Sequence, residues 1–297
     1  MKEIIIAMDS FKGSMTSLEA GNAIKKAIQN IHPAWNIQVY PVADGGEGTL
    51  EALTYQQKVT RRTCMITGPL GNPIEASYLW YERNLEKTAV IEMAQAAGLP
   101  LVPEEKRNPL HTTTYGVGEL IQNAIRQGCT RFIIGIGGSA TNDGGVGMLQ
   151  ALGYGFLDKD GNQVPFGAKG LKVLEEITDT YVLPELKECK FKIACDVTNA
   201  LCGEQGCSAV FGPQKGATPE MIRQMDQWLG YYAALAKEKF PKADAKQEGT
   251  GAAGGLGFAF LTFTDAVLES GIKIVLEETQ LEEYVKDADL VITGEGR

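Results

Sequence analysis

The sequence predicts an α/β protein of about two domains. Apolar and amphipathic segments alternate over residues 4–55, which is typical of a parallel sheet covered by helices. Near Val59 the pattern changes to closely spaced β-rich segments, and these indicate an antiparallel or mixed sheet. The chain has 297 residues, of which 44% are hydrophobic, so it can bury a sizeable core, and its length fits about two domains.

The first elements follow one another in βαβ order. Residues 4–8 form a short apolar strand that ends at Asp9, and residues 17–30 carry apolar side chains at helical spacing. A second strand is expected over residues 37–42, followed by an acidic glycine turn and a helix over residues 47–55.

The remaining elements alternate less regularly. The patterns predict strands over residues 61–66, 75–81, 88–93, 131–136 and 289–293, and helices over 116–127, 145–152 and 220–239. The polar segment 241–248 is expected to be an exposed loop. Only residues 294–297 follow the last strand. A parallel sheet seldom ends on an uncovered strand, so the sequence is expected to be a fragment or to lack its C-terminal part.

The composition argues against several classes of protein. The net charge is -9 and no Lys/Arg cluster stands out, which argues against nucleic-acid binding. The six cysteines form no CxxC pair and there are two histidines, so a zinc site is not expected. The start of the chain does not resemble a secretory leader, and no apolar stretch is long enough for a membrane span. A cytoplasmic protein with reduced thiols is therefore predicted.

Glycine-rich loops with acidic or hydroxyl side chains recur, mostly after apolar segments. They cover residues 9–14, 43–49, 135–145, 249–255 and 293–297, and a similar polar loop without glycine covers 195–199. In open α/β sheets ligands bind beyond the carboxyl ends of the strands, and glycine lets backbone N–H groups approach a phosphate. Carboxylates in such loops can hold Mg²⁺ or accept a proton. Turn formation is the better explanation of any single loop and a weaker one of the repetition, so composition alone leaves both turn formation and phosphoryl transfer open.

Other nucleotide-binding and catalytic motifs fit poorly. A Walker A motif, the protein-kinase signature set and the GxSxG motif of hydrolases are all absent from the sequence. Residues 135–140 match GxGxxA, but 141–145 interrupt any helix directly after them. Residues 249–254 match GxGxxG, but they follow a polar segment and not a strand. A nucleotide-dependent oxidoreductase and a non-catalytic ligand-binding protein stay as alternatives.

A set of motifs in consistent order resembles the type 1 glycerate kinase family. The motifs are DSFKGS at 9–14, ADGGEGT at 43–49, TTTYGVGEL at 112–120, GIGGSATNDGG at 135–145, CDVTN at 195–199, FGPQKG at 211–216 and TGEGR at 293–297. The resemblance runs over residues 2–297 and implies an enzyme that transfers a phosphoryl group from ATP to glycerate, with Mg²⁺. Glycerate and ATP are thus the expected partners, nucleic acid and membranes are not, and a homo-oligomer is left open.

The resemblance also implies a fold of two α/β domains with the active site in a cleft. A split Rossmann-like, parallel-sheet domain is expected over residues 1–62 and 286–297, and a mixed-sheet α/β domain over 63–285 is expected to be inserted into it. Members of the family continue well past the TGEGR motif. The Rossmann-like domain is therefore expected to be incomplete at its C-terminal side.

Roles can be assigned to individual residues on this basis. Asp196 is the first candidate for the general base that accepts the glycerate hydroxyl proton, and Asp143 is the second. Lys12 is expected to contact phosphate or the glycerate carboxylate, and Asp44 and Glu47 are expected to bind Mg²⁺ or substrate. For each carboxylate the alternative is loop capping or turn formation, which is strongest for Asp143. The other residues expected to bind substrate or phosphate are Asp9, Ser10, Gly13, Gly45, Gly46, Thr112, Gly137, Gly138, Ser139, Thr141, Thr198, Asn199, Lys215, Glu295 and Arg297.

Overall fold

The computed structural model describes residues 2–11, 14–43, 48–55 and 57–296. The chain forms two compact units, one from Met1–Val59 with Glu269–Arg297 and the other from Thr60–Leu268. Both ends of the chain therefore contribute to unit 1, whereas unit 2 is one continuous segment. The predicted domain boundaries, after residues 62 and 285, stay a prediction.

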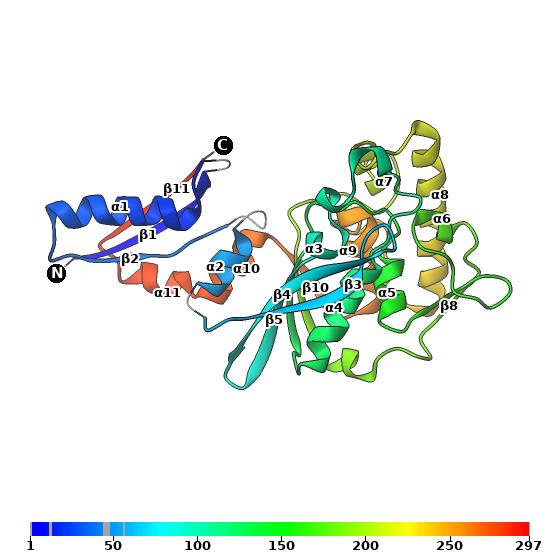
Figure 1. Cartoon of the computed structure of the whole chain (residues 1–297), viewed down its shortest axis with the longest axis horizontal. Coiled ribbons are helices and arrows are strands. Elements are labelled where there is room, and N and C mark those ends of the chain that lie inside the picture. The colour runs from blue at the N-terminus through cyan, green and yellow to red at the C-terminus, as the bar shows by residue number, and fades with distance from the viewer. Residues whose placement is uncertain (1, 12–13, 44–47, 56, 297) are drawn as a thin grey trace. The chain divides into compact units, whose positions relative to one another are not determined.

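Unit 1 is built on a parallel sheet of three strands in the order β11-β1-β2. The first strand of the chain, β1 (Glu3–Phe11), lies between β2 (Asn36–Val39) and the last strand, β11 (Leu290–Gly296). In Figure 1 the blue β1 and the red β11 lie side by side. The helices of this unit are α1 (Ser17–Ile31), α2 (Thr49–Thr54), α10 (Gly271–Thr279) and α11 (Leu281–Lys286).

Helix α1 begins at a capping box and packs on this sheet. The Thr16 hydroxyl accepts a hydrogen bond from Glu19 N at 3.2 Å, and the Glu19 carboxylate accepts one from Thr16 N at 2.8 Å. Apolar residues of α1, among them Ala20, join Ile4 and Ile6 of β1 in a small core. The Ser17 hydroxyl donates to the Met8 carbonyl, which ties the helix start to the carboxyl end of β1.

Unit 2 is built on a mixed sheet of six strands in the order β10-β9-β6-β5-β4-β3. The antiparallel strands β3, β4 and β5 are followed by β6 and β9, which run parallel to β5. The strands are β3 (Thr60–Thr67), β4 (Pro73–Arg83), β5 (Glu86–Glu92), β6 (Arg131–Gly135), β9 (Lys190–Ala194) and β10 (Ala266–Glu269), with β7 (Gly155–Leu157) and β8 (Glu176–Thr178) forming a small separate sheet. A parallel sheet and a separate mixed sheet confirm the predicted fold class.

The helices of unit 2 enclose one large apolar core. Phe132 of β6 and Phe191 of β9 stack there at 4.8 Å between ring centroids, and Phe260 contacts the latter ring. The helices are α3 (Ala94–Ala97), α4 (Tyr115–Arg126), α5 (Val146–Ala151), α6 (Ala168–Leu171), α7 (Cys207–Phe211), α8 (Pro219–Lys239) and α9 (Ala252–Phe263). The sequence analysis did not predict α3, α6, α7 or α9. Within the described ranges, no helix is long and apolar enough to cross a membrane.

Candidate active site

The parallel strands of unit 2 bring several predicted site residues to one edge. Glu92 of β5, Gly135 of β6 and Ala194 of β9 lie in register at the carboxyl ends of their strands. The loops that follow β6 and β9 therefore leave the sheet at the same edge, which is where ligands bind in open α/β sheets. These loops carry the predicted residues Gly137, Gly138, Ser139, Thr141, Asp196, Thr198 and Asn199.

The loop after β6 is fixed by the segment 93–99 and presents open backbone. Met93 N donates to Gly135 O at 2.9 Å, and Leu99 N donates to Gly138 O at 2.8 Å. Gly137 and Gly138 are exposed, and a Cβ added to Gly137 would meet no atom within 4 Å. Gly138 has a φ of +72°, a conformation that glycine adopts without strain. The loop thus offers backbone that a phosphate could approach closely.

Lys215 lies buried behind this loop. Its side chain is only 1% exposed, and its Nζ donates to Ser139 Oγ at 2.7 Å and to Thr141 O at 2.6 Å. Because an ammonium group has no acceptor, the Ser139 hydroxyl accepts this bond and keeps its own hydrogen for another partner. Burial lowers the pKa of Lys215 to about 8, and the nearby Cys207 and Asp143 oppose that shift. The structure therefore places a titratable positive charge against the predicted phosphate loop.

Asp143 lies buried in the same loop, and its carboxylate holds the surrounding backbone by hydrogen bonds. Its Oδ2 accepts hydrogen bonds from Thr114 N and Oγ1, both at 2.9 Å, and from Gly147 N at 3.3 Å, and its Oδ1 accepts one from Gly145 N at 3.2 Å. Burial raises the pKa of Asp143, whereas these hydrogen bonds lower it. The carboxylate thus joins the first turns of α4 and α5 to the loop. This geometry favours the capping alternative, and the role of Asp143 as a base stays a prediction.

Some buried polar groups around the loop have no partner of their own. Thr141 Oγ1 and Asn142 Oδ1 have no hydrogen bond within the described part of the chain, although both residues are fully buried. Such atoms cost free energy unless they find a partner. Thr112, by contrast, is buried and donates to Ala140 O at 2.8 Å, which makes it a support of the loop backbone.

The loop after β9 divides into an exposed and a fixed part. Asp196 and Thr198 are exposed at the sheet edge. The Asn199 side chain donates to Gln205 O at 2.8 Å, and its carbonyl accepts from Gly251 N at 2.9 Å. The first two residues are therefore placed to meet a ligand, and Asn199 holds the loop.

Unit 1 has a carboxyl edge of its own, where β1 bulges. The register between β1 and β11 shifts between Met8 and Phe11, and Asp9 and Ser10 lie in this irregular step. Asp9 Oδ1 accepts from Ser10 N at 2.5 Å, and the buried Ser10 Oγ has no partner among the described residues. Glu295 is exposed on β11. The other residues predicted for this unit, Lys12, Gly13, Asp44, Gly45, Gly46, Glu47 and Arg297, lie outside the described residues.

The sequence analysis missed two residues that the fold brings to the unit 2 site. Glu92 ends β5 next to Gly135, and Arg107 lies against Gly216 with its Nε buried and unpaired in the described chain. Glu92 is not followed by a glycine loop, so the pattern used for the other strands did not select it. Its position directly after an apolar strand was the available indication.

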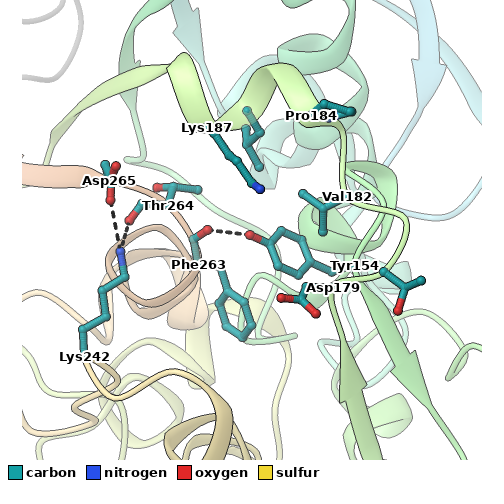
Figure 2. A pocket seen from close by; sticks show the side chains of 11 residues that line it. Tyr154, Asp179, Val182, Pro184, Lys187, Lys242, Phe263, Thr264 and Asp265 are labelled. Carbon is teal, nitrogen blue, oxygen red and sulfur yellow. Dashed lines mark hydrogen bonds and ion pairs between the residues drawn. The ribbon is translucent and has the colours of Figure 1, made fainter.

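A cavity of about 360 Å³ lies elsewhere in unit 2, and Figure 2 shows its lining. None of the predicted site residues that the structure describes lines it. The Tyr154 hydroxyl donates to Phe263 O at 2.6 Å, and Lys242 Nζ donates to Thr264 O at 2.5 Å. Asp179, also in the lining, pairs with Lys239 at 2.7 Å. Because these polar groups already have partners within the protein, the cavity does not compete with the loop edge as the active site.

Open glycine backbone, a buried lysine and carboxylates at one sheet edge define an α/β protein suited to a phosphate-bearing ligand. The family model described as "Glycerate kinase family" matches residues 4–297. The chain belongs to the glycerate kinase family and is accordingly a phosphotransferase, which confirms the resemblance and removes the support for an oxidoreductase.

Individual relatives cover the chain from end to end. A glycerate kinase from Halalkalibacterium halodurans is 49% identical over 298 residues, which span 100% of this chain and 78% of the relative. A protein named glycerate 2-kinase from Escherichia coli is 49% identical over 295 residues, 99% of this chain and 77% of the relative. A crystal structure described as glycerate kinase 2 from Salmonella typhimurium superposes with a TM-score of 0.95 at 47% identity, covering 100% of this chain and 79% of that chain.

Proposed function

We propose that this chain phosphorylates D-glycerate, with ATP as the phosphoryl donor and Mg²⁺ as the metal. The observation that supports this best is the open backbone at Gly137 and Gly138, with the buried Lys215 behind it. In this proposal the loop binds the transferred phosphates, and Lys215 offsets their charge. Asp196 and Thr198 at the same edge are candidates for contact with glycerate. The predicted cytoplasmic location is part of the proposal.

The 2-hydroxyl of glycerate is the proposed acceptor. The Escherichia coli relative carries the name glycerate 2-kinase, and 99% of this chain aligns with it at 49% identity. A product phosphorylated at that position is 2-phosphoglycerate. Enolase dehydrates this compound directly, whereas 3-phosphoglycerate first needs a mutase, so the two products are easily distinguished.

The ligands that Mg²⁺ prefers are compatible with this chain. Mg²⁺ usually binds through one or two carboxylates and the phosphates of its substrate, so it needs no complete protein cage. Over the described ranges, no group of three or more His, Cys, Asp or Glu side chains could hold a metal ion. The predicted ligands Asp44 and Glu47 lie outside those ranges and stay the candidates. When bound, the ion would neutralise charge on the phosphate oxygens.

A coupled assay tests the proposed reaction. The chain is expected to form ADP only when D-glycerate, ATP and Mg²⁺ are all present, and to produce phosphoenolpyruvate when enolase alone is added. Phosphoenolpyruvate that appears only after a mutase is also added would assign the 3-hydroxyl instead. ADP formation that does not depend on glycerate would contradict the proposal.

Replacing Gly137 with alanine tests the phosphate loop. The added methyl group meets no protein atom within 4 Å, so the melting temperature is expected to stay unchanged. The same methyl group would hinder the approach of phosphate. Losing one hydrogen bond to a charged group costs about 1.5–3 kcal/mol, so the KM for ATP is expected to rise about 10- to 100-fold.

Gly230→Ala is the matched control for this loop variant. Gly230 lies within α8, and a Cβ there would come no closer than 4.0 Å to Cys202 Sγ. Alanine should stabilise the helix by about 0.5–1 kcal/mol and leave ATP binding unchanged. Equal KM values for ATP in Gly137→Ala and in the unaltered chain would show that the loop does not bind the nucleotide.

A further inference from the structure

Glu92 is a carboxylate at the end of β5, the strand that pairs with β6 next to the phosphate loop. It pairs in register with Gly135 of β6, the last strand residue before the loop, and Ala194 of β9 follows on the other side. Neighbouring strands lie about 4.8 Å apart, so Glu92 is one strand away from the loop start. The segment that begins at Met93 then runs along the loop and donates to the carbonyls of Gly135 and Gly138.

Strand alternation places the Glu92 side chain away from the large core. Ile91 is fully buried in the core of unit 2, and successive residues of a strand point to opposite faces. Glu92 therefore shares the other face with Val90 and lies at the end where the loop begins. The nearest charged residues of β9 are Lys192, two residues before Ala194, and Asp196, two residues after it.

The Glu92 carboxylate is half-buried and has no neutralising partner among the residues that the structure describes. Within the described part of the chain, no hydrogen bond or ion pair joins it to another residue. Burial alone raises its pKa above the ordinary value for glutamate. A half-buried, unpaired carboxylate costs free energy, and such groups collect where a protein uses them chemically. Asp196, in contrast, is exposed.

We propose that Glu92, and not Asp196, is the general base of the phosphoryl transfer. This inference rests on the proposed function. The Glu92 carboxylate accepts the hydroxyl proton of glycerate while that oxygen forms a bond to the γ-phosphorus of ATP. The bond between the γ-phosphorus and the oxygen bridging it to the β-phosphate breaks, and ADP leaves with that electron pair. The proton then passes from Glu92 to solvent, so the products are phosphoglycerate, ADP and one proton.

Glu92→Gln tests this role because glutamine keeps the shape and removes the basic oxygen. The variant is expected to lose about 10²–10⁴-fold in kcat, the range typical of a general base. It should still be stabilised against heat by ATP and by glycerate. Its own melting temperature should be unchanged or higher, because the substitution removes a half-buried charge without breaking a hydrogen bond.

The pH profile separates a base from a structural residue. The base must be deprotonated, so kcat/KM of the unaltered enzyme should fall as the pH falls through the pKa of Glu92. The residual activity of Glu92→Gln should lack this acid limb. Glu86→Gln is the matched control, because Glu86 begins the same strand at the opposite end and pairs with the exposed Arg131 at 3.3 Å.

Two results would overturn the inference. One is a Glu92→Gln enzyme with nearly normal kcat or with an intact acid limb. The other is an acid limb that disappears in Asp196→Asn and persists in Glu92→Gln. Both require an active parent enzyme. A parent chain without glycerate-dependent ADP formation would instead contradict the proposed function itself, and the two failures are thus distinguishable.

Discussion

Lys215→Met is expected to lower kcat/KM for glycerate phosphorylation about 10²–10³-fold, the usual cost of removing a preorganised electrostatic group. Methionine fills the buried space but supplies no donor to Ser139 Oγ or Thr141 O, which the ammonium now holds at 2.7 and 2.6 Å. The loop therefore loses the positive charge beside it and the two hydrogen bonds from the ammonium group. Steady-state kinetics at pH 7 and thermal unfolding of the same preparation measure the two effects separately.

The pH dependence of activity gives a second measure of this lysine. Burial holds the pKa of Lys215 at about 8, so the positive charge is lost as the pH rises through that value. Activity of the parent enzyme should therefore decline above about pH 8 through this group. Residual activity of the methionine variant should lack this decline. Unchanged kcat/KM in the variant would show that the loop works without the buried cation.

The contribution of Lys215 to stability is expected to rise with pH, opposite to its effect on activity. The unfolded chain keeps the lysine proton up to about pH 10.5, the ordinary pKa of lysine, so between pH 8 and 10.5 it binds more protons than the folded chain. The free energy of unfolding then gains a contribution that rises with pH across this window. The buried cysteines titrate in a neighbouring pH range. The contribution of Lys215 is therefore isolated by comparing the free energy of unfolding of the parent with that of Lys215→Met.

Asp143→Ala is expected to destabilise unit 2 by about 4 kcal/mol or more. The change leaves the N–H groups of Thr114, Gly145 and Gly147 without their buried acceptor, at about 1–3 kcal/mol for each unsatisfied group. Total stabilities are about 5–15 kcal/mol, so a large part of the protein should unfold or fail to accumulate. Thermal or urea unfolding measures the loss.

Asp158→Ala serves as the matched control for this variant. Asp158 also accepts backbone hydrogen bonds in a turn, from Asp160 N at 3.0 Å and Asn162 N at 2.9 Å, but those bonds are exposed. Water can replace its carboxylate, so a loss of no more than about 1 kcal/mol is expected. If Asp143→Ala kept the parent stability and lost only activity, the catalytic role predicted from the sequence would gain support over the capping role.

Local patterns were enough to predict the end of β6 and the loop that follows it, whereas β1 and β11 continue through Phe11 and Gly296 into segments that were predicted as loops. The loop at residues 135–145 was recognised from its glycine, hydroxyl and acidic residues, and the FGPQKG motif from the family resemblance. Their contact could not be predicted, because Lys215 and Ser139 lie 76 residues apart in sequence and meet only through tertiary packing. The functional meaning of Asp143 likewise depends on Thr114, which lies 29 residues before it.

Helix α9 shows a different limit of the sequence analysis. Its first turns contain Ala253, Gly254 and Gly255 with positive φ, so the glycine pattern predicted a loop. The apolar residues that follow are buried on nearly every side and therefore show no helical periodicity. Glu92 was not predicted for a related reason. Its proposed role depends on its pairing with Gly135 of the neighbouring strand β6 and not on the pattern of its own segment.

The pairing of β1 with β11 has a consequence for how the chain reaches its fold. Glu3 N donates to Asp289 Oδ2 at 2.7 Å across a separation of 286 residues. Closing a flexible loop of that length costs about 5 kcal/mol of chain entropy beyond a constant. Unit 2 is continuous in sequence and makes its own contacts within residues 60–268, so it can form first and shorten the flexible path between the two strands. During synthesis one edge of β1 therefore stays unpaired until β11 emerges from the ribosome, so these two strands can pair only after unit 2 has been synthesised.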